Sequence, residues 1–293
     1  MKKMIVILLA CVLGIAIILK DKKSNTEPID LNVNAKAMLL MDADTGKVIY
    51  QKNSETPLPI ASMSKLMTQY LVLDAIKSNS LTWESTYEPS EHVQRLFGST
   101  AIVKLGMKPG NTYTVKELFT AMTVASANDA AIALAEMVGG TEESFVELMN
   151  DQAVKFGMKE TTYFNASGLD GNYVGQGKEQ TNLSSAQDVA VIAQKLIGKY
   201  PEVLEFTKMT SFQTSEGITL WSTNLMLAGM PQAMLGIDGL KTGFTDEAGS
   251  CFAGTGIFDG RRNITVVIGV EVEGEDTINS RFDLTRELIE RFN

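Results

Sequence analysis

Strand-like apolar runs lie near both ends of this sequence, and helical patterns fill the middle. The runs are residues 37–42 and 47–51 on the N-terminal side and residues 239–242, 250–257 and 263–272 on the C-terminal side. Ala43-Asp44-Thr45-Gly46 separates the first two and Asp259-Gly260 the last two, and both are typical of hairpin turns. Because strands and helices pack in layers around one core, this order predicts an α+β fold. We expect one antiparallel sheet built from both chain ends, with an inserted helical subdomain.

The predicted helices are marked by apolar spacing and by capping residues. Thr114 and Glu117 form a capping-box pattern, Ser185 is a typical N-cap, and Gly139-Gly140 and Gly157 are typical helix ends. With 293 residues, of which 44% are hydrophobic, the chain can bury a large core. The predicted helices span residues 62–77, 115–125, 129–139, 141–157, 186–197 and 278–292.

The N-terminal residues predict export from the cytoplasm. Met1-Lys2-Lys3 precede sixteen uncharged, mostly aliphatic residues, 4–19, and then a lysine-rich stretch. Such a start is typical of a signal sequence, although sixteen residues fall slightly short of the ~20 in a spanning helix. Because no small-x-small cleavage site precedes the charges, we favour an uncleaved membrane anchor at residues 1–23 over a removed signal. A linker at residues 24–34 would then lead to a domain at residues 35–293 on the extracytoplasmic side.

Composition and residue counts exclude several kinds of chemistry. The net charge of −9 gives an acidic surface that repels phosphate backbones, so we expect no nucleic-acid partner. His92 is the only histidine, and a zinc site made of several His or Cys ligands cannot form with only two cysteines present. A Ser-His-Asp triad would have to use His92. If Cys11 lies in the membrane, Cys251 has no disulfide partner, and its apolar surroundings predict a small buried side chain.

Three short motifs carry the candidate chemistry: Ser62-Met63-Ser64-Lys65, Ser126-Ala127-Asn128 and Lys241-Thr242-Gly243. Residues three apart share a helix face, so Lys65 can reach Ser62. A serine hydroxyl needs a base to become a nucleophile, and a lysine can act as one if burial or a neighbouring cation lowers its pKa. In the second motif, a hydroxyl and an amide in a loop can pass a proton and hold a substrate carbonyl. The third motif suits an edge strand that pairs with an extended peptide.

Each motif alone also has a purely structural interpretation. Ser62 could cap a helix while Lys65 is solvated, and the other two motifs could be a helix boundary and a strand end. Ser222-Thr223-Asn224 repeats the second pattern. We prefer the first copy, because it lies in the predicted helical part and could face the Ser62 helix across a cleft. The three motifs in this order and spacing favour the catalytic interpretation.

Together the motifs resemble those of the β-lactamases and penicillin-binding proteins. Over residues 35–292 the chain is most similar to the D-alanyl-D-alanine carboxypeptidases, the low-molecular-mass penicillin-binding proteins of the S11 peptidase family. This resemblance implies a β-lactamase/penicillin-binding-protein-like fold with the active site between sheet and helical subdomain. It also implies a serine enzyme that removes the terminal D-alanine from peptidoglycan stem peptides and is acylated by β-lactams, and we expect no metal or cofactor. The blocks that carry the resemblance are MDADTGKVIY, PIASMSKLMT, SANDAAIALAE, FGMKETTYFNASGL, SAQDVAVIA, GIDGLKTGFTDEAG and RFDLTRELIERF.

Residue by residue, the resemblance implies roles for three catalytic side chains and for a group of substrate-binding residues. Ser62 would be the nucleophile, Lys65 its base and Ser126 a proton relay. The implied substrate-binding residues are Asn128, Lys241, Thr242, Gly243, Phe244 and Arg281. Lys241 would also help to keep Lys65 neutral, and the backbone N–H groups of Ser62 and Phe244 would form the oxyanion hole. For Arg281, carboxylate recognition and a surface salt bridge are equal alternatives.

Two departures from the family pattern and three rival functions accompany this interpretation. Typical members continue into a β-rich second domain with a C-terminal anchor, whereas this chain ends at Asn293, so we expect no such domain. Ser64 stands where threonine is common. A β-lactamase would need a deacylating base such as Glu160, which lacks the accompanying Leu-Asn. The other rivals are a D,D-endopeptidase and a non-catalytic module that binds β-lactams or cell wall.

Overall fold

The computed structural model describes residues 34–95, 102–173, 177, 179–271 and 277–292. Every described residue belongs to one compact unit of the chain, Val33–Asn293. The membrane anchor expected at residues 1–23 lies outside the described residues, as does the expected linker apart from Asn34. Among the described residues, none of the helices combines the length and the apolar character needed to span a membrane.

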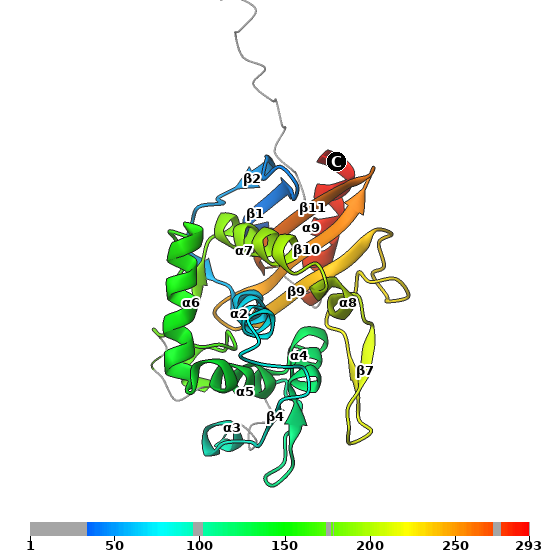
Figure 1. The fold of residues 1–293 in the computed structure, drawn as a ribbon. Coiled ribbons are helices and arrows are strands. Elements are labelled where there is room, and N and C mark those ends of the chain that lie inside the picture. The colour runs from blue at the N-terminus through cyan, green and yellow to red at the C-terminus, as the bar shows by residue number, and fades with distance from the viewer. Residues whose placement is uncertain (1–33, 96–101, 174–176, 178, 272–276, 293) are drawn as a thin grey trace, which may run out of the picture. The chain divides into compact units, whose positions relative to one another are not determined.

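A five-stranded antiparallel sheet forms from both ends of the described chain, in the order β2-β1-β11-β10-β9 (Figure 1). The strands are β1 (Asn34–Asp42), β2 (Val48–Lys52), β9 (Ile237–Thr245), β10 (Gly249–Phe258) and β11 (Arg261–Glu271). β1 lies between β2 and β11, so that Leu39 pairs with Gln51 on one side and with Val266 on the other. The sheet predicted from the two chain ends is therefore confirmed.

Both predicted hairpin turns have the local chemistry that their sequences indicate. The carboxylate of Asp42 accepts hydrogen bonds from the N–H and the hydroxyl of Thr45, each at 2.8 Å, and Gly46 has a φ of +71°. At the other hairpin, Asp259 and Gly260 have φ values of +47° and +77°. Positive φ at both central residues matches the twist of the flanking strands, which is why Asp-Gly is favoured there.

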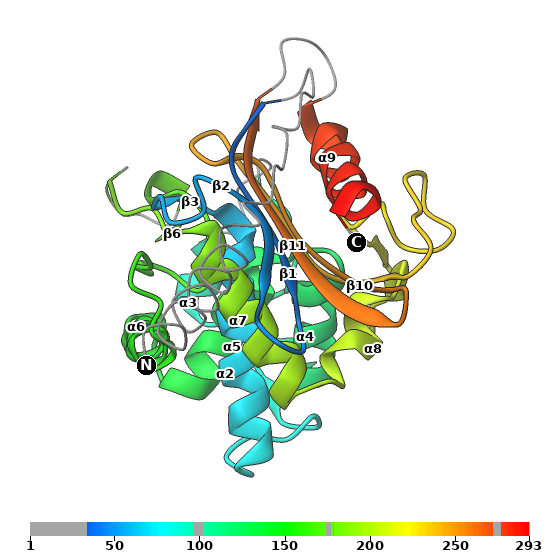
Figure 2. The ribbon, with the colours of Figure 1, turned by 90° about the horizontal axis from the view of Figure 1, so that it is seen from above.

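Helices cover both faces of the sheet (Figure 2). The helix α9 (Thr277–Phe292) packs against β10 and β11 on one face, where the rings of Phe282 and Phe252 meet edge to face at 5.2 Å. The helix α7 (Ala186–Lys199) packs against β1 and β11 on the other face, together with the rest of the helical part. The edge strand β9 packs against residues 61–64, the turn that carries Ser62.

The longer helices form where the sequence predicts them. Their caps agree with the pattern: Thr114, Thr141 and Ser185 each accept a hydrogen bond from the N–H three residues ahead, and Gly157 closes a helix with a φ of +72°. The helices are α2 (Lys65–Lys77), α4 (Val115–Val124), α5 (Asn128–Gly139), α6 (Glu142–Phe156), α7 and α9.

The prediction of an α-helix starting at Ser62 was wrong by three residues. Residues Ala61–Ser64 form a 3₁₀ turn, η1, and the α-helix begins at Lys65. Several short elements were not predicted at all. They are β3 (Leu58–Pro59) paired with β6 (Leu183–Ser184), β4 (Thr86–Tyr87) with β5 (Tyr113–Thr114), β7 (Ser211–Gln213) with β8 (Thr219–Trp221), the helices α3 (Glu91–Arg95) and α8 (Val203–Thr207), and the 3₁₀ turn η3 (Gly171–Tyr173).

Two helices at the centre of the helical part are buried on nearly all sides. In α2, nine residues are buried, including the polar Thr68 and Gln69. In α5, the run from Ala130 to Ala135 is completely inaccessible, and four of its six residues are alanines. Small side chains allow α5 to approach α2 and α4 closely, and packing of this density fixes the positions of the residues at the helix ends. Those ends carry Lys65 and Asn128.

Candidate active site

The turn that carries Ser62 is pressed between two glycines from distant parts of the chain. A Cβ atom on Gly243 of β9 would lie 2.9 Å from the carbonyl oxygen of Ile60 and 3.3 Å from the nitrogen of Ser62. A Cβ atom on Gly168, whose φ is +77°, would lie 2.0 Å from the carbonyl oxygen of Ala61. Only residues without side chains permit such approaches. The sheet edge and the loop around Gly168 therefore both meet the backbone of Ser62.

The Lys65 ammonium or amine group lies beside the Ser62 hydroxyl in a fully buried position. Its Nζ atom is 2.9 Å from Ser62 Oγ, 2.7 Å from Asn128 Oδ1 and 2.5 Å from the carbonyl oxygen of Ser167. Burial lowers the pKa of Lys65 well below its ordinary value; the charge of Lys241 adds to this and that of Asp129 opposes it. The pair predicted from Ser62-Met63-Ser64-Lys65 is therefore in hydrogen-bond contact.

The second motif lies at the start of α5 and faces the same place. Ser126 ends the preceding turn with a φ of +65° and is almost fully buried. The Asn128 side chain donates through Nδ2 to the carbonyl oxygen of Val103 at 2.9 Å. Because that bond uses the amide nitrogen, the amide oxygen is turned toward Lys65. Asn128 thus joins Lys65 to the segment around Val103.

The third motif lies on the edge strand β9. Lys241 is 1% exposed, and its Nζ donates to the carbonyl oxygen of Thr242 at 3.1 Å. Burial, with the charge of Arg281 adding to it, lowers the pKa of Lys241 to about 7. The Thr242 hydroxyl donates to Thr223 Oγ1 at 2.6 Å, and the Phe244 side chain is half-exposed.

Arg281 enters the site from α9, beneath the sheet edge. It is 5% exposed, and it donates to the carbonyl oxygens of Gly243 at 3.0 Å and Cys251 at 3.4 Å. Within the described residues its Nε atom has no hydrogen-bond partner. Burial lowers its pKa to about 10. A surface salt bridge, one of the two interpretations of this residue, is inconsistent with its burial.

A cavity of about 260 Å³ lies where these elements meet. All the predicted site residues line this cavity except Lys65 and Lys241. These two lysines are buried behind the lining residues. The lining residues are Ser62, Ile102, Val103, Ser126, Asn128, Leu169, Tyr173, Thr223, Thr242, Gly243, Phe244, Thr245, Asp246 and Arg281.

Thr223 is a polar lining residue that we did not predict, although it lies inside a sequence pattern that we had noted. It belongs to Ser222-Thr223-Asn224, the second copy of the Ser-x-Asn pattern, which we set aside in favour of the first. In that copy the outer residues serve the local fold: Ser222 Oγ accepts from the Asn224 N–H, and Asn224 Oδ1 accepts from the Met226 N–H. The middle residue points to Thr242 instead. Both copies of the pattern therefore lie at the site, but only the first presents its serine and asparagine to the cavity.

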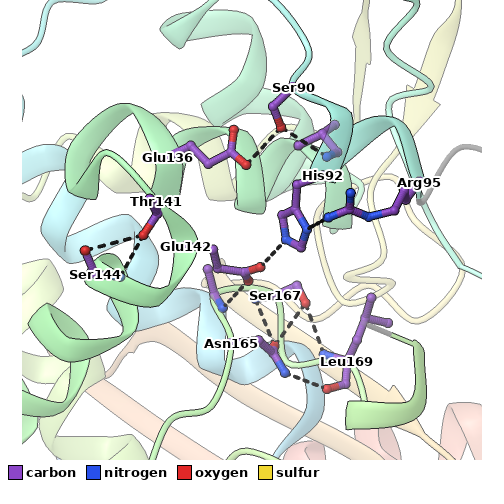
Figure 3. Close-up of polar contacts among 12 residues, drawn as sticks. Ser90, His92, Arg95, Glu136, Thr141, Glu142, Ser144, Asn165, Ser167 and Leu169 are labelled. Carbon is purple, nitrogen blue, oxygen red and sulfur yellow. Dashed lines mark hydrogen bonds and ion pairs between the residues drawn. The ribbon is translucent and has the colours of Figure 1, made fainter. Parts of the chain in front are cut away.

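Two residues weighed in the sequence lie elsewhere. His92 hydrogen-bonds to Glu142 and Arg95 and does not line the cavity, so a Ser-His-Asp triad is absent from the described residues (Figure 3). Cys251 is a buried free cysteine, as its apolar surroundings predict. Within the described ranges no cluster of His, Cys, Asp and Glu could hold a metal ion.

Comparison with known proteins decides the family. The family model described as Peptidase S11, D-alanyl-D-alanine carboxypeptidase, matches residues 21–272. The chain belongs to the S11 peptidase family. It is 34% identical over 258 residues to the D-alanyl-D-alanine carboxypeptidase DacF of Bacillus subtilis, covering 87% of this chain and 62% of that one. The carboxypeptidase DacC of Escherichia coli is 33% identical, with coverage of 83% and 58%. The chain thus spans about three fifths of the curated relatives that it matches.

Solved structures of penicillin-binding proteins share the fold, as the resemblance predicts. PBP3 of Streptococcus pneumoniae, described as a peptidoglycan synthesis regulatory factor, matches with a TM-score of 0.83 and 40% identity, covering 89% of this chain and 71% of that one. The ampicillin-bound penicillin-binding protein D2 of Listeria monocytogenes gives a TM-score of 0.74 and 37% identity, covering 87% and 96%. The α+β architecture of this S11 family member is therefore that of the penicillin-binding proteins.

Glu160, the residue considered as a β-lactamase deacylating base, lies outside the site. It is exposed beyond the end of α6, and its backbone N–H donates to the Asp188 carboxylate at 2.8 Å. It does not line the cavity beside Ser62. The β-lactamase alternative therefore lacks the deacylating base that the sequence offered for it.

Proposed function

We propose that this chain is a serine-type D-alanyl-D-alanine carboxypeptidase, which removes the terminal D-alanine from peptidoglycan stem peptides and is acylated by β-lactams. The observation that carries the proposal is the contact of 2.9 Å between Lys65 Nζ and Ser62 Oγ inside an S11 family fold. The relatives named above are carboxypeptidases, and two Listeria penicillin-binding protein D2 structures hold ampicillin and cefotaxime.

The partners of Lys65 support its role as the base. Two of its three acceptors, the Asn128 amide oxygen and the Ser167 carbonyl oxygen, carry no proton of their own. A neutral amine has two N–H groups, which these two oxygens accept, and one lone pair, which is left for the Ser62 hydroxyl. Burial and the Lys241 charge lower the pKa of Lys65, which favours this neutral form. Lys65 is thus arranged to take the Ser62 proton.

In the acylation step, Lys65 removes the Ser62 proton while Oγ attacks the carbonyl carbon of the penultimate D-alanine. The carbonyl oxygen then carries negative charge, and we assign its stabilisation to the backbone N–H groups of Ser62 and Phe244. The close approach of Gly243 to the Ser62 nitrogen brings these two segments together. When the tetrahedral intermediate collapses, the C–N bond breaks and the leaving D-alanine amine takes a proton, relayed through Ser126. Water then hydrolyses the ester on Ser62.

Recognition of the free carboxylate is assigned to the sheet side of the cavity. Thr242 and Arg281 line the cavity there, and the buried Lys241 lies directly behind, with its Nζ bonded to the Thr242 carbonyl oxygen. Arg281 keeps Nε without a partner among the described residues. Gly243 lets an extended peptide approach the edge strand, and Asn128 would hold a substrate amide on the opposite wall. A carboxylate after the scissile bond is the feature that distinguishes a carboxypeptidase substrate from a cross-linked peptide.

The location that we propose is the extracytoplasmic face of the bacterial membrane, with residues 1–23 as the anchor. The support is the sequence itself: a basic start, sixteen uncharged residues and no small-x-small cleavage site. Peptidoglycan stem peptides lie on that side of the membrane, so the anchor would hold the enzyme next to its substrate.

The decisive experiment measures D-alanine release from an N-acylated tripeptide ending in D-alanyl-D-alanine. The full-length chain in detergent should release D-alanine steadily and should form one covalent adduct with penicillin on the Ser62 peptide. Ser62→Ala should do neither, and Lys65→Arg should be acylated far more slowly because arginine stays protonated. Adduct formation by Ser62→Ala would refute the nucleophile assignment. Acylation without D-alanine release would indicate a binding module.

A further inference from the structure

The only histidine of the chain is joined to the loop behind Lys65 through one buried carboxylate (Figure 3). His92 lies on the short helix α3, and its Nε2 atom is 2.8 Å from Glu142 Oε2. Glu142 is the first residue of α6 and is 7% exposed. Its other oxygen, Oε1, accepts from the backbone N–H of Ala166 at 2.9 Å. Each oxygen of this carboxylate therefore holds a different segment.

The loop from Asn165 to Leu169 is held internally by one asparagine. Asn165 Oδ1 accepts from the N–H and the hydroxyl of Ser167 and from the N–H of Gly168, at 2.7 to 3.2 Å (Figure 3). Asn165 Nδ2 donates to the carbonyl oxygen of Leu169 at 2.9 Å. These bonds hold the loop residues in fixed positions relative to one another. A displacement of Ala166 would therefore also displace Ser167.

This loop contacts both members of the Ser62–Lys65 pair. The Ser167 carbonyl oxygen accepts from Lys65 Nζ, and Gly168 lies against the backbone of Ala61 and Ser62. The Ser167 carbonyl is one of the two acceptors that orient a neutral Lys65. A shift of the loop would therefore turn the Lys65 lone pair away from Ser62.

His92 can donate a hydrogen bond to Glu142 whether its own ring is neutral or protonated. Arg95 donates to His92 Nδ1 at 3.0 Å, which requires that Nδ1 accept and that Nε2 carry the proton toward Glu142. On protonation, Nδ1 also becomes a donor and the contact with Arg95 is lost, while Nε2 still donates to Glu142. The hydrogen bond with Glu142 raises the His92 pKa, the charge of Glu136 adds to this, and that of Arg95 opposes it.

We propose that Glu142, braced by His92, is a positioning residue that holds the Ser167 carbonyl against Lys65 and so sets the rate of Ser62 acylation. The inference rests on the proposed function, because it assigns a part in that reaction to two residues outside the cavity. The geometry of the Ser62–Lys65 pair would then depend on Glu142 and His92, which do not line the cavity.

The pH profile of acylation separates positioning from a merely structural role. Acylation needs neutral Lys65, so its rate rises with pH through the Lys65 pKa, which Lys241 and Asp129 also influence, and it falls where Lys241 loses the charge that meets the penicillin carboxylate. The plateau is the maximum between these two limits. The Ser167 carbonyl dipole favours the protonated amine. When the carbonyl moves away, the Lys65 pKa falls and the midpoint of the profile moves to lower pH, while misdirection of the lone pair lowers the plateau. Loss of folded protein changes neither the midpoint nor the rate per folded molecule.

The experiment uses the full chain in detergent and measures acylation by a fluorescent penicillin from about pH 5 to 10, normalised to folded protein. In Glu142→Ala we expect a plateau about 10-fold lower and a midpoint about half a unit lower. Glu142→Gln should recover most of the rate, because its amide oxygen can accept from the Ala166 N–H. The amide nitrogen can then donate to His92 Nε2 once the ring takes its other tautomer and gives up the bond from Arg95. His92→Ala should show the same two changes in smaller measure. The matched controls are Glu143→Ala and Glu91→Ala, exposed neighbours on α6 and α3.

The controls should behave as the wild-type protein does. If Glu142→Ala has the plateau and midpoint of Glu143→Ala, the inference is overturned. If Glu142→Ala does not fold, His92→Ala and Glu142→Gln decide: a lowered midpoint in His92→Ala with recovery in Glu142→Gln supports the inference, and unchanged His92→Ala profiles overturn it. Absence of acylation at Ser62 in the wild-type protein would instead refute the proposed function.

Discussion

Three buried basic side chains at the site, Arg281, Lys241 and Lys65, influence one another's protonation. The charge of Arg281 lowers the pKa of Lys241, and the charge of Lys241 lowers the pKa of Lys65, while burial acts on all three. Arg281 stays protonated at physiological pH, so its effect on the Lys241 pKa is constant there. In the proposed reaction one lysine, Lys65, can therefore serve as a base, while Lys241, directly before the lining residue Thr242, can serve as a cation.

We predict a bell-shaped pH dependence of kcat/KM for a substrate with a free carboxylate. The rising limb is the loss of the Lys65 proton, and the falling limb is the loss of the Lys241 charge as pH rises through about 7 in the free enzyme. In Lys241→Arg the falling limb should move to higher pH, because arginine keeps its charge. Steady-state kinetics from pH 5 to 10 check this, and an unmoved falling limb in Lys241→Arg would contradict it.

Gly168 offers a second prediction at the scale of single residues. In Gly168→Ala, the new Cβ would overlap the Ala61 carbonyl oxygen in addition to adopting an unfavourable φ of +77°. Gly110 has a φ of +80° with nothing within 4 Å of its Cβ position, so Gly110→Ala carries the backbone strain alone. We expect Gly110→Ala to cost about 1–2 kcal/mol and Gly168→Ala about 2 kcal/mol more. Urea unfolding measures both, and equal losses would show that the loop yields freely.

The sequence predicts those site residues whose side chains form a motif, and it does not predict those that act through backbone atoms. Ser62, Lys65 and Asn128 meet as their pattern indicates. The Ser167 carbonyl carries no side-chain signal, and its distance from Lys65 is set by tertiary packing. Thr223 was not predicted for a different reason. In Ser222-Thr223-Asn224 the middle residue, rather than the outer two, lines the cavity.

At the scale of elements, length decides what could be predicted. The six long helices and the strands of the main sheet repeat their apolar pattern often enough to be read from the sequence. Strands of two residues, such as β3 and β6, and helices of five residues, such as α3 and α8, contain no full period. They form because the chain between longer elements satisfies its backbone groups there, so only the assembled molecule defines them.

A further prediction at the scale of elements concerns Asp129, at the start of α5. Asp129 accepts from the N–H groups of Leu105 and Gly106, each at 2.8 Å, and so holds the segment whose Val103 carbonyl orients Asn128. Asp129→Ala leaves a buried N–H group without an acceptor, and we expect a loss of about 2–3 kcal/mol together with slower acylation. Asp129→Asn, which keeps one oxygen, should lose less of both. Chemical unfolding and penicillin acylation measure the two effects, and full activity in Asp129→Ala would rule out this linkage.

At the scale of the whole molecule, the proposed reaction takes its nucleophile from the helical part and its carboxylate site from the sheet edge. A charge-assisted hydrogen bond is worth about 1.5–3 kcal/mol, so a peptide carboxamide should be cleaved about 10- to 100-fold less well than the acid. Thr242→Val should reduce this preference, because the methyl group keeps the shape and loses the donor. Arg281→Ala should also reduce it. Equal cleavage of acid and carboxamide by the wild-type enzyme would favour an endopeptidase.

The N-terminal segment gives a prediction about the cell. The full-length chain should sediment with membranes and be released by detergent but not by high salt, because its attachment is apolar. A chain that begins at Ser24 should stay in the supernatant. Fractionation of expressing cells with antibody detection checks both. Mass spectrometry that finds only a product cleaved near residue 23 would show that the segment is a removed signal.

The pairing of β1 with β11 also bears on how the molecule assembles. Leu39 meets Val266 in neighbouring strands, so the centre of the sheet closes only after nearly the whole chain is present. Contacts of such long sequence separation slow folding, because loop-closure entropy is lost before the contacts form. A chain synthesised from its N-terminus can pair β1 with β2 early, but the other edge of β1 stays unpaired until the last hairpin arrives. Local helical contacts can form during that interval, and the two halves of the active site meet last.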